Sequence, residues 1–378
     1  LRRDADAGVT GLAVTQLTLS HLRSHRRTEL SVDARPIAIH GPNGAGKTNI
    51  LEAVSLLSPG RGLRRAGAED LIRRPEALGW KVSAILQTPT QVHEIETRAE
   101  PGESRQVRID GKASAQVALG RIARIVWLIP AMDRLWIEGA DGRRRFLDRA
   151  TMSFIPTHGE AVLTYEKSMR ERNRLLKDMV RDAHWYVALE RQMAEAGAAV
   201  MHNRRTAVDR LAAAQVGTSS DFPAAELSIV HPDNALPETA DDMAEMLSGN
   251  RSNDLRAGRT LIGPHRIDLK AVYSDKGVAA AQCSTGEQKA LLISLVLTNA
   301  RALAEDTGAA PLILLDEIAA HLDSGRRAAL YEEICALRAQ AWMTGTGAEL
   351  FAELGDRAQH LEVTDTDGES VVRRKEAP

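Results

Sequence analysis

Cysteine, aromatic residues and long apolar runs are all scarce in this chain of 378 residues. Its two cysteines, Cys283 and Cys335, are too few for a disulfide framework. No apolar run approaches the roughly 18 to 20 residues that cross a bilayer, so we expect no membrane-spanning helix. The sequence begins without a basic segment followed by an apolar core, and we therefore expect a cytoplasmic protein.

An excess of charge of either sign is also missing. The chain has 49 Lys and Arg against 51 Asp and Glu, a formal net charge of −2, so a polyanion would need a local basic face. Aromatic residues make up 3%, which argues against an aromatic platform that stacks nucleic-acid bases. The remaining composition, 43% hydrophobic and 26% charged, is typical of folded globular proteins and allows two or three domains.

Hydrophobic spacing divides the chain into α/β ends and a helical middle. Apolar periodicity and turn residues predict strands within 12–40, a helix at 48–57, a strand-rich flank at 80–126, helices within 143–201, a mixed segment at 222–259, a strand at 267–272, a helix at 285–303 and a strand at 312–315. The predicted fold class is α/β, with a compact and mainly helical second lobe inserted between the two ends.

The strongest local signal is a glycine-rich loop between a predicted strand and a predicted helix. It reads Gly41, Pro42, Asn43, Gly44, Ala45, Gly46, Lys47, Thr48 and matches the complete Walker A pattern of a P-loop. In such a loop, backbone N–H groups surround the phosphates, Lys47 reaches the β and γ oxygens, and Thr48 binds Mg²⁺. The loop predicts a site for ATP and Mg²⁺.

An acidic pair follows the apolar run at 312–315. A buried parallel strand that ends in carboxylates is typical of a Walker B element. Asp316 is the second predicted Mg²⁺ ligand, and Glu317 is predicted to orient or deprotonate the attacking water. Alone the pair is weak evidence, since a strand followed by a polar cap looks the same, but the P-loop upstream favours the functional interpretation.

A third element lies between these two, at the start of the long predicted helix. The segment Cys283, Ser284, Thr285, Gly286, Glu287, Gln288, Lys289 allows an N-cap at Ser284 with Glu287 in the capping-box position. It also resembles the signature motif of the ABC-type ATPase superfamily. That resemblance implies that Ser284 and its helix contact the γ-phosphate held by a second copy of the chain, and that Asp323 lies in the D-loop.

Further segments resemble the RecF family of bacterial recombination mediators. These are 44–53, 143–148, 165–177 and 263–269, while Thr344 resembles the family's sensor of the γ-phosphate. The sequence departs from the family at 22–25 and at 128–133, which leaves the Q-loop residue unassigned. The predicted domains are 1–140, an N-terminal ATPase part; 141–255, the helical lobe; and 256–378, the ATPase core with signature, Walker B and D-loop.

The RecF resemblance implies a function as well as a fold. It implies an ATP-dependent DNA clamp that dimerises on duplex or gapped DNA, hydrolyses ATP slowly to release it, and assists the loading of RecA. Lys47, Asp316, Glu317 and the partner's Ser284 would carry the reaction, and RecR and possibly RecO would be partners. The SOS response and DNA replication belong to the same expected context.

Arginines are the predicted contacts to DNA, because the planar guanidinium donates two parallel hydrogen bonds to a phosphate. The candidates are Arg64 and Arg65 after the first helix and Arg143 and Arg144 at the start of the helical lobe; a helical set that includes Arg172 is a weaker one. A solvated helix face with acidic neighbours is about equally compatible with each cluster. Arg204 is expected to be surface charge, and binding should be independent of base sequence and sensitive to salt.

Three other functions fit parts of the sequence. A transporter subunit would have the same nucleotide motifs, but the helical insertion and the missing switch histidine argue against it. A different ABC-type repair or defence ATPase remains open. So does an ATP-binding scaffold whose hydrolysis is incidental, which the sequence does not separate from the clamp.

Overall fold

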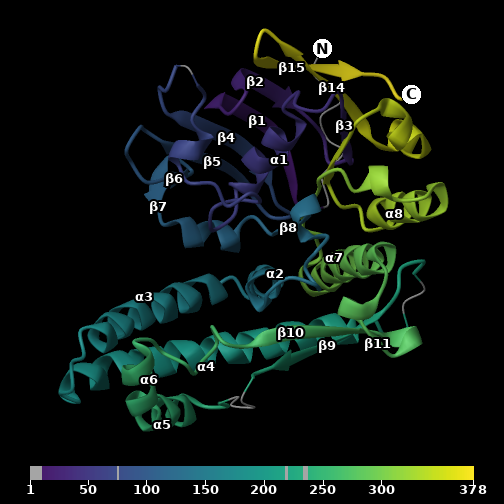
Figure 1. The fold of residues 1–378 in the computed structure, drawn as a ribbon. Helices are drawn as coiled ribbons and strands as arrows, with labels where there is room; N and C mark the ends of the chain where they lie inside the picture. Colours follow the sequence, from purple (N-terminus) through teal and green to yellow (C-terminus); the bar gives the residue numbers. More distant parts are fainter. Residues whose placement is uncertain (1–10, 75, 218–219, 233–236) are drawn as a thin grey trace. The chain divides into compact units, whose positions relative to one another are not determined.

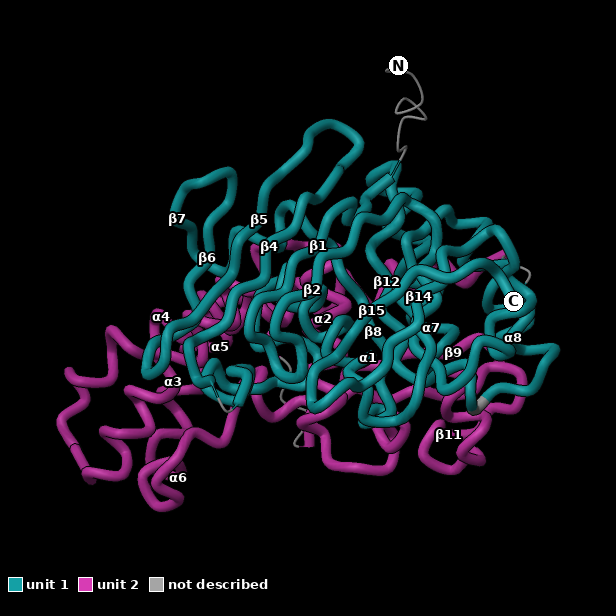
Figure 2. The backbone as a smooth tube through the Cα atoms, turned by 90° about the horizontal axis from the view of Figure 1, so that it is seen from above, with its two compact units in different colours: residues 1–132, 219–222, 292–378 teal, residues 133–218, 223–291 magenta. Residues whose placement is uncertain are grey.

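The computed structural model describes residues 11–74, 76–217, 220–232 and 237–378. It divides into two compact units, coloured separately in Figure 2. Unit 1 comprises 1–132, 219–222 and 292–378, and unit 2 comprises 133–218 and 223–291. These limits differ from the predicted domain limits at 140 and 255: the helix α7 (Thr285–Thr307) begins in unit 2 and ends in unit 1, so the signature segment belongs to unit 2.

The first sheet of unit 1 is mainly parallel and has the strand order β15-β14-β3-β13-β12-β8. Its strands are β3 (Ile37–His40), β8 (Ile125–Leu128), β12 (Leu312–Leu315), β13 (Ala341–Gly345), β14 (Gln359–Thr366) and β15 (Glu369–Lys375). Only β15 runs antiparallel to its neighbour. All four residues of β12 are buried, as expected of an apolar strand with parallel neighbours on both sides.

The second sheet of unit 1 is antiparallel, in the order β2-β1-β4-β5-β6-β7. It contains β1 (Ala13–Leu22), β2 (His25–Ser31), β4 (Trp80–Gln87), β5 (Val92–Ala99), β6 (Gln106–Ile109) and β7 (Lys112–Ser114). Along β4, every second side chain is buried, which is the pattern of a strand with one face on the core. The strand-rich flank predicted at 80–126 is therefore confirmed.

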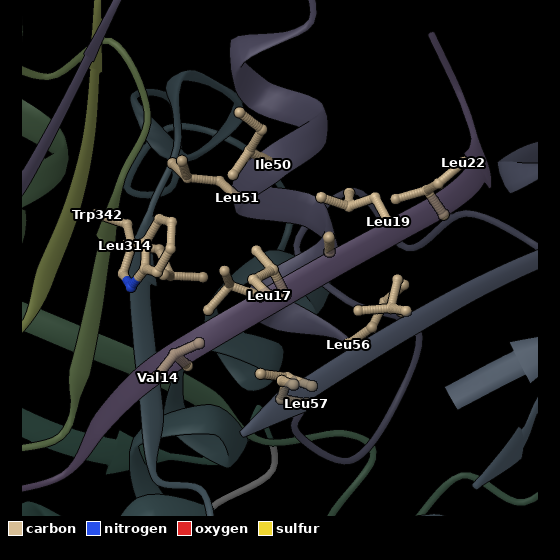
Figure 3. Close-up of a cluster of buried hydrophobic side chains, with 14 of the residues drawn as sticks. Val14, Leu17, Leu19, Leu22, Ile50, Leu51, Leu56, Leu57, Leu314 and Trp342 are labelled. Atoms are coloured by element: carbon tan, nitrogen blue, oxygen red, sulfur yellow. The ribbon is translucent and has the colours of Figure 1, made fainter. Parts of the chain in front are cut away.

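The main core of unit 1 joins both sheets to the helix α1 (Lys47–Ser55). Figure 3 shows Leu17 and Leu19 of β1 beside Ile50 and Leu51 of α1, with Trp342 of β13 in the same cluster. All five side chains are fully buried. Because α1 begins at Lys47, within the P-loop motif, this packing fixes the base of the loop. The helix α8 (Ser324–Ala336) completes the unit.

Unit 2 contains the helical lobe predicted at 143–201 and a small antiparallel sheet in the order β11-β10-β9. Its elements are α2 (Ala140–Phe154), α3 (His158–Lys177), α4 (His184–Ala213), β9 (Ala225–Val230), α5 (Ala240–Gly249), α6 (Arg251–Ala257), β10 (Asp268–Tyr273) and β11 (Val278–Ala279). Figure 1 shows α3 and α4 side by side, and Tyr165, Met193 and Met243 lie in the core between the helices.

Two arginines of unit 2 lie elsewhere than the sequence suggests. Arg172 is fully buried in α3, where it donates to Glu190 at 2.9 Å and to Asp254 at 2.7 Å. Arg204, expected at the surface, is buried in α4 and forms a bidentate ion pair with Asp148 at 2.7 and 2.9 Å. Their charges are compensated inside the fold, so neither guanidinium can contact DNA. Helical periodicity alone did not identify the carboxylates, which come from other elements.

No helix in the described part of the chain combines the length and the apolar character needed to cross a membrane.

Candidate nucleotide site

The P-loop lies between β3 and α1 of unit 1, where the sequence predicts it. Gly41 has φ 149°, and a Cβ there would lie 2.0 Å from the carbonyl oxygen of Val363 in β14. Gly46 has φ 102°, and its Cβ would lie 2.1 Å from the Ser370 Oγ. Glycine is thus required twice, for left-handed backbone and for close approach of neighbouring strands. The loop can then end in the first turn of α1, whose N–H groups favour an anion.

Lys47 points back across this loop. Its Nζ donates to the carbonyl oxygens of Gly41 at 2.6 Å and Pro42 at 2.8 Å. Burial lowers the pKa of Lys47, while the nearby carboxylates of Glu317 and Asp316 raise it. The ammonium is therefore held by the loop itself, where a phosphate chain bound by the loop would meet it.

Thr48, Asp316 and Thr344 are brought together by the parallel sheet. In the order β3-β13-β12, the P-loop follows β3, Thr344 lies near the end of β13, and Asp316 follows β12. The carboxyl ends of parallel strands meet at one edge, which is where α/β proteins bind ligands. Thr48 Oγ1 and Thr344 Oγ1 both donate to Asp316 Oδ1, each at 2.8 Å. The predicted Walker A and Walker B residues are thus in direct contact.

Glu317 is held by the same threonine. Its backbone N–H donates to Thr344 Oγ1 at 2.9 Å, and its backbone is left-handed, with φ 55°. A non-glycine residue in this region is uncommon and often marks a functional position. Thr344 is 1% exposed and so connects Asp316 to Glu317 from inside the fold. The geometry places the sequence-predicted sensor candidate next to both carboxylate residues.

The back of the loop contains residues that the sequence patterns missed. The His25 ring lies 3.1 Å from the Gly46 carbonyl oxygen, and the Ser370 Oγ lies 2.6 Å from that of Ala45. His25 belongs to β2 and Ser370 to β15, which is 325 positions from the loop. No local motif marks either residue; only the pairing of the strands around the loop brings them to it.

The signature segment lies in unit 2, at the start of α7. Ser284 is exposed; its N–H and Oγ are each 2.8 Å from the Glu287 carboxylate, and the Glu287 N–H points back to the Ser284 Oγ at 3.4 Å. The Lys276 ammonium and Ser284 donate to Glu287 and lower its pKa to about 2. The capping box predicted from the sequence is therefore present, and it leaves the serine on the surface. Asp323 caps α8 by accepting from the Arg326 N–H at 2.9 Å.

Five arginines line a pocket of about 750 Å³ in unit 1, which we call the arginine pocket. Arg64, Arg65 and Arg74 are exposed, whereas Arg23 is half-buried and Arg73 is buried. Two acidic residues, Glu69 and Asp70, belong to the same lining. Arg23 donates to the buried Glu52 through two nitrogens, at 2.9 and 3.0 Å, so part of this charge is compensated. Arg64 lies 3.8 Å from the same carboxylate.

The other two arginine candidates are occupied inside unit 2. Arg143 forms a bidentate ion pair with Asp268 at 2.7 and 2.9 Å, and its side chain is 11% exposed. Arg144 donates to the Ile267 carbonyl oxygen at 2.8 Å and pairs with Asp141. Both arginines connect α2 to β10, Arg143 through Asp268 and Arg144 through Ile267, the residue before the strand. Contact with DNA would require these side chains to leave their present partners.

A P-loop, an acidic strand end and a signature segment, carried by an α/β core with a helical insertion, define an ABC-type ATPase head. The family model for the RecF/RecN/SMC N-terminal domain matches residues 13–368. DNA replication and repair protein RecF of Mesorhizobium japonicum is 46% identical over 364 residues, or 93% of this chain and 96% of that protein. The protein of the same name from Rhizobium etli is 45% identical over 365 residues, or 94% of this chain and 98% of that protein.

Solved structures agree in fold. The recombination mediator protein RecF-ATPrS of the RecFOR pathway has a TM-score of 0.80 at 21% identity, covering 96% of this chain and 98% of that one. The Smc head domain from Pyrococcus furiosus has a TM-score of 0.56 at 17% identity, covering 97% and 96%. The chain belongs to the RecF family.

Proposed function

We propose that this chain is an ATP-dependent DNA clamp of recombinational repair, which closes as a dimer on DNA with ATP and opens on hydrolysis. The observation that carries the proposal is the cluster of Thr48, Asp316 and Thr344 beside Lys47. It unites, in one edge of the sheet, the groups that phosphoryl transfer requires. The relatives named RecF, which cover nearly the whole chain, support the repair role.

The donor set fits Mg²⁺. No group of three or more His, Cys, Asp or Glu side chains that could hold a metal occurs among residues 11–74, 76–217, 220–232 and 237–378. Mg²⁺ at nucleotide sites needs no such cage, since it uses one or two protein oxygens with phosphates and waters. Thr48 Oγ1 and Asp316 Oδ1 are the oxygens that would hold it. When bound, the ion neutralises charge on the β- and γ-phosphate oxygens.

The residues of unit 1 have separate tasks in hydrolysis. Lys47 and the N–H groups of the loop bind and orient the phosphates. Glu317 accepts a proton from, or orients, the water that attacks the γ-phosphate. Thr344 keeps Asp316 and the Glu317 backbone in register, because its hydroxyl bonds to both. We place Ser284 of a second copy on the γ-phosphate, since the signature is exposed and starts a helix whose N-terminus favours anions.

The DNA contact is assigned to Arg64 and Arg65. Both are exposed, and both line the arginine pocket of unit 1. Arg143 and Arg144 are weaker candidates, because Asp268 and Asp141 already pair with them. Contacts to phosphate alone would give binding that ignores base sequence and weakens with salt. Membership of the RecF family supports RecR and RecO as partners. The proposed outcome is the loading of RecA at gapped DNA, in the cytoplasm.

The proposal is tested by ATP hydrolysis measured against protein concentration, with and without duplex DNA. We expect a more than linear rise with concentration, stimulation by DNA, and loss of hydrolysis with retained ATP binding in Glu317→Gln. A rate linear in concentration and indifferent to DNA would contradict the clamp and favour a scaffold that binds ATP.

A salt titration of DNA binding separates the arginines. In Arg64→Ala and Arg65→Ala, the slope of log affinity against log salt should fall by about one unit for each lost phosphate contact. Arg191→Ala, on the exposed face of α4, is the matched control and should leave the slope unchanged. An unaltered slope in the first two variants would move the DNA site away from the pocket.

A further inference from the structure

Two consecutive carbonyl groups of the P-loop contact side chains, and the second also accepts from the Asn49 backbone N–H at 3.0 Å. They belong to Ala45 and Gly46, and their partners are Ser370 and His25. A peptide plane that turns its C=O to the back turns its N–H to the front. The N–H groups at the front are those that bind phosphate, so whatever holds these carbonyls also aims the donors.

The direction of each hydrogen bond around Ser370 follows from what a carbonyl can do. The Ala45 oxygen only accepts, so the Ser370 hydroxyl donates its proton there, at 2.6 Å. The Ser24 Oγ lies 2.6 Å from the Ser370 Oγ and must supply the proton between them. The Asn49 Nδ2 in turn donates to the Ser24 Oγ at 2.7 Å. Asn49, Ser24 and Ser370 thus form a chain in which every donor points toward the loop.

His25 completes the support on the neighbouring carbonyl. Its Nε2 lies 3.1 Å from the Gly46 oxygen and its Nδ1 2.9 Å from the Thr28 hydroxyl. Since the carbonyl accepts, the proton resides on Nε2 and Thr28 donates to Nδ1. The ring is fully buried, and burial lowers the pKa of His25, which favours this neutral form. The tautomer is therefore fixed from both sides.

The outer end of this series of hydrogen bonds is Arg64, a residue of the arginine pocket. Arg64 Nη1 donates to the Asn49 Oδ1 at 3.1 Å, and the opposite side of the same amide donates inward. Arg64 is exposed, whereas Ser370 is 3% exposed. The series Arg64, Asn49, Ser24, Ser370 consequently runs from the surface to the nucleotide loop without a reversal of donor direction.

We propose that Ser370 and His25 are positioning residues of the nucleotide site, and that the series from Arg64 to Ser370 connects the P-loop to the arginine pocket. The connection to the arginine pocket rests on the proposed function, because through it a DNA phosphate bound to Arg64 would affect ATP binding. Ser370 and His25 each contact a loop carbonyl oxygen, and each acts through the peptide that it holds. This goes beyond the P-loop pattern, which contains neither residue.

The Kd for ATPγS is the measured quantity, because Ser370 and His25 would leave it unchanged if they only stabilised the fold. We expect Ser370→Ala to raise the Kd for ATPγS with Mg²⁺ about fivefold to tenfold, the value of one lost hydrogen bond to a buried carbonyl. Ser370→Thr keeps the hydroxyl and should restore most of the affinity. His25→Phe should weaken binding similarly, and His25→Gln, which keeps an N–H donor, should recover part of it. Titration calorimetry measures all four.

Controls separate folding from positioning. Ser31→Ala removes an exposed hydroxyl from β2 and should leave the Kd unchanged. Thermal unfolding of each variant sets the temperature for titration, well below every midpoint. If folded Ser370→Ala and His25→Phe bind ATPγS with the parental Kd, the positioning role is wrong. The parental chain is titrated in the same series to test the proposed function separately. If the parental chain fails to bind ATPγS, the proposed function is wrong. If the parental chain binds and the variants keep its Kd, only this inference is wrong.

A double variant tests the connection to the pocket. If Arg64 and Ser370 act through one series, Arg64→Ala alone should weaken ATPγS binding, and adding it to Ser370→Ala should weaken binding no further. An Arg64→Ala variant with the parental Kd would refute the connection. Multiplied effects would show independent action and would refute the connection. The connection also predicts an effect of DNA. A short duplex should alter the Kd for ATPγS in the parental chain and in Ser31→Ala but not in Ser370→Ala. An equal shift of the Kd in Ser370→Ala would also refute the connection.

Discussion

Replacing Thr344 by valine removes a single hydroxyl that serves both carboxylate residues of the nucleotide site. Valine is β-branched like threonine and has nearly the same shape, so the buried strand β13 should keep its packing. The hydroxyl donates to Asp316 at 2.8 Å and accepts from the Glu317 N–H at 2.9 Å. A hydrogen bond to a charged group contributes about 1.5–3 kcal/mol, and the N–H left behind loses its acceptor as well.

We expect this loss to appear mainly in the rate of hydrolysis. A change of about 1.4 kcal/mol corresponds to tenfold in rate, so kcat/KM should fall roughly 10- to 100-fold in Thr344→Val. Phosphate release across a range of ATP concentrations measures it. Thr344→Ser keeps the hydroxyl and should stay within about threefold of the parental rate. A folded Thr344→Val that hydrolyses ATP at the parental rate would show that the hydroxyl does not align these groups.

The other predictions concern stability and ATP binding. Arg172→Met leaves two buried carboxylates without their shared partner and should lower the free energy of unfolding by about 3–5 kcal/mol, seen as an earlier urea midpoint. Burial raises the pKa of Asp148, but the charge and hydrogen bonds of its partners outweigh burial and lower the pKa from 3.8 to about 2. The stabilisation by this carboxylate is complete above pH 3.8 and disappears as the pH falls through 2. Asp148→Asn should therefore flatten the decline in stability at acid pH. Gly41→Ala would force a Cβ to 2.0 Å from the Val363 carbonyl oxygen and should abolish ATP binding. Gly44→Ala, with open space around it, should cost only about 1 kcal/mol of backbone strain. Calorimetry with ATPγS compares the two variants, and equal binding by both would contradict the close approach at Gly41.

Local patterns in the sequence identified the parts of the site that lie close together along the chain. The P-loop, the strand β12 and the start of α7 each combine a hydrophobic period with a short polar motif, and each lies where that pattern predicts it. The contact between Thr48 and Asp316, 268 positions apart, also follows from the rule that parallel strands open at one edge. The family resemblance added Thr344, which no period or motif of its own marks.

Features that depend on distant partners were not accessible in this way. Arg172 and Arg204 have the helical spacing of surface charge, yet carboxylates from other elements meet them inside unit 2. Ser370 and His25 reach the P-loop only because β15 and β2 begin beside it. The domain limits differ for a similar reason, since a helix as long as α7 can belong to both units while its sequence shows no break.

The central claim is that two copies of the chain share each ATP site. Lys47→Met disables the P-loop of one copy, and Ser284→Ala disables the signature that the partner would receive. Each variant alone should be inactive with saturating duplex DNA. In an equal mixture, random pairing puts half of the chains in mixed dimers with one intact site of two, so the account predicts roughly a quarter of the parental rate per chain. A mixture as inactive as its components, with mixed dimers verified by a tag, would contradict the shared site.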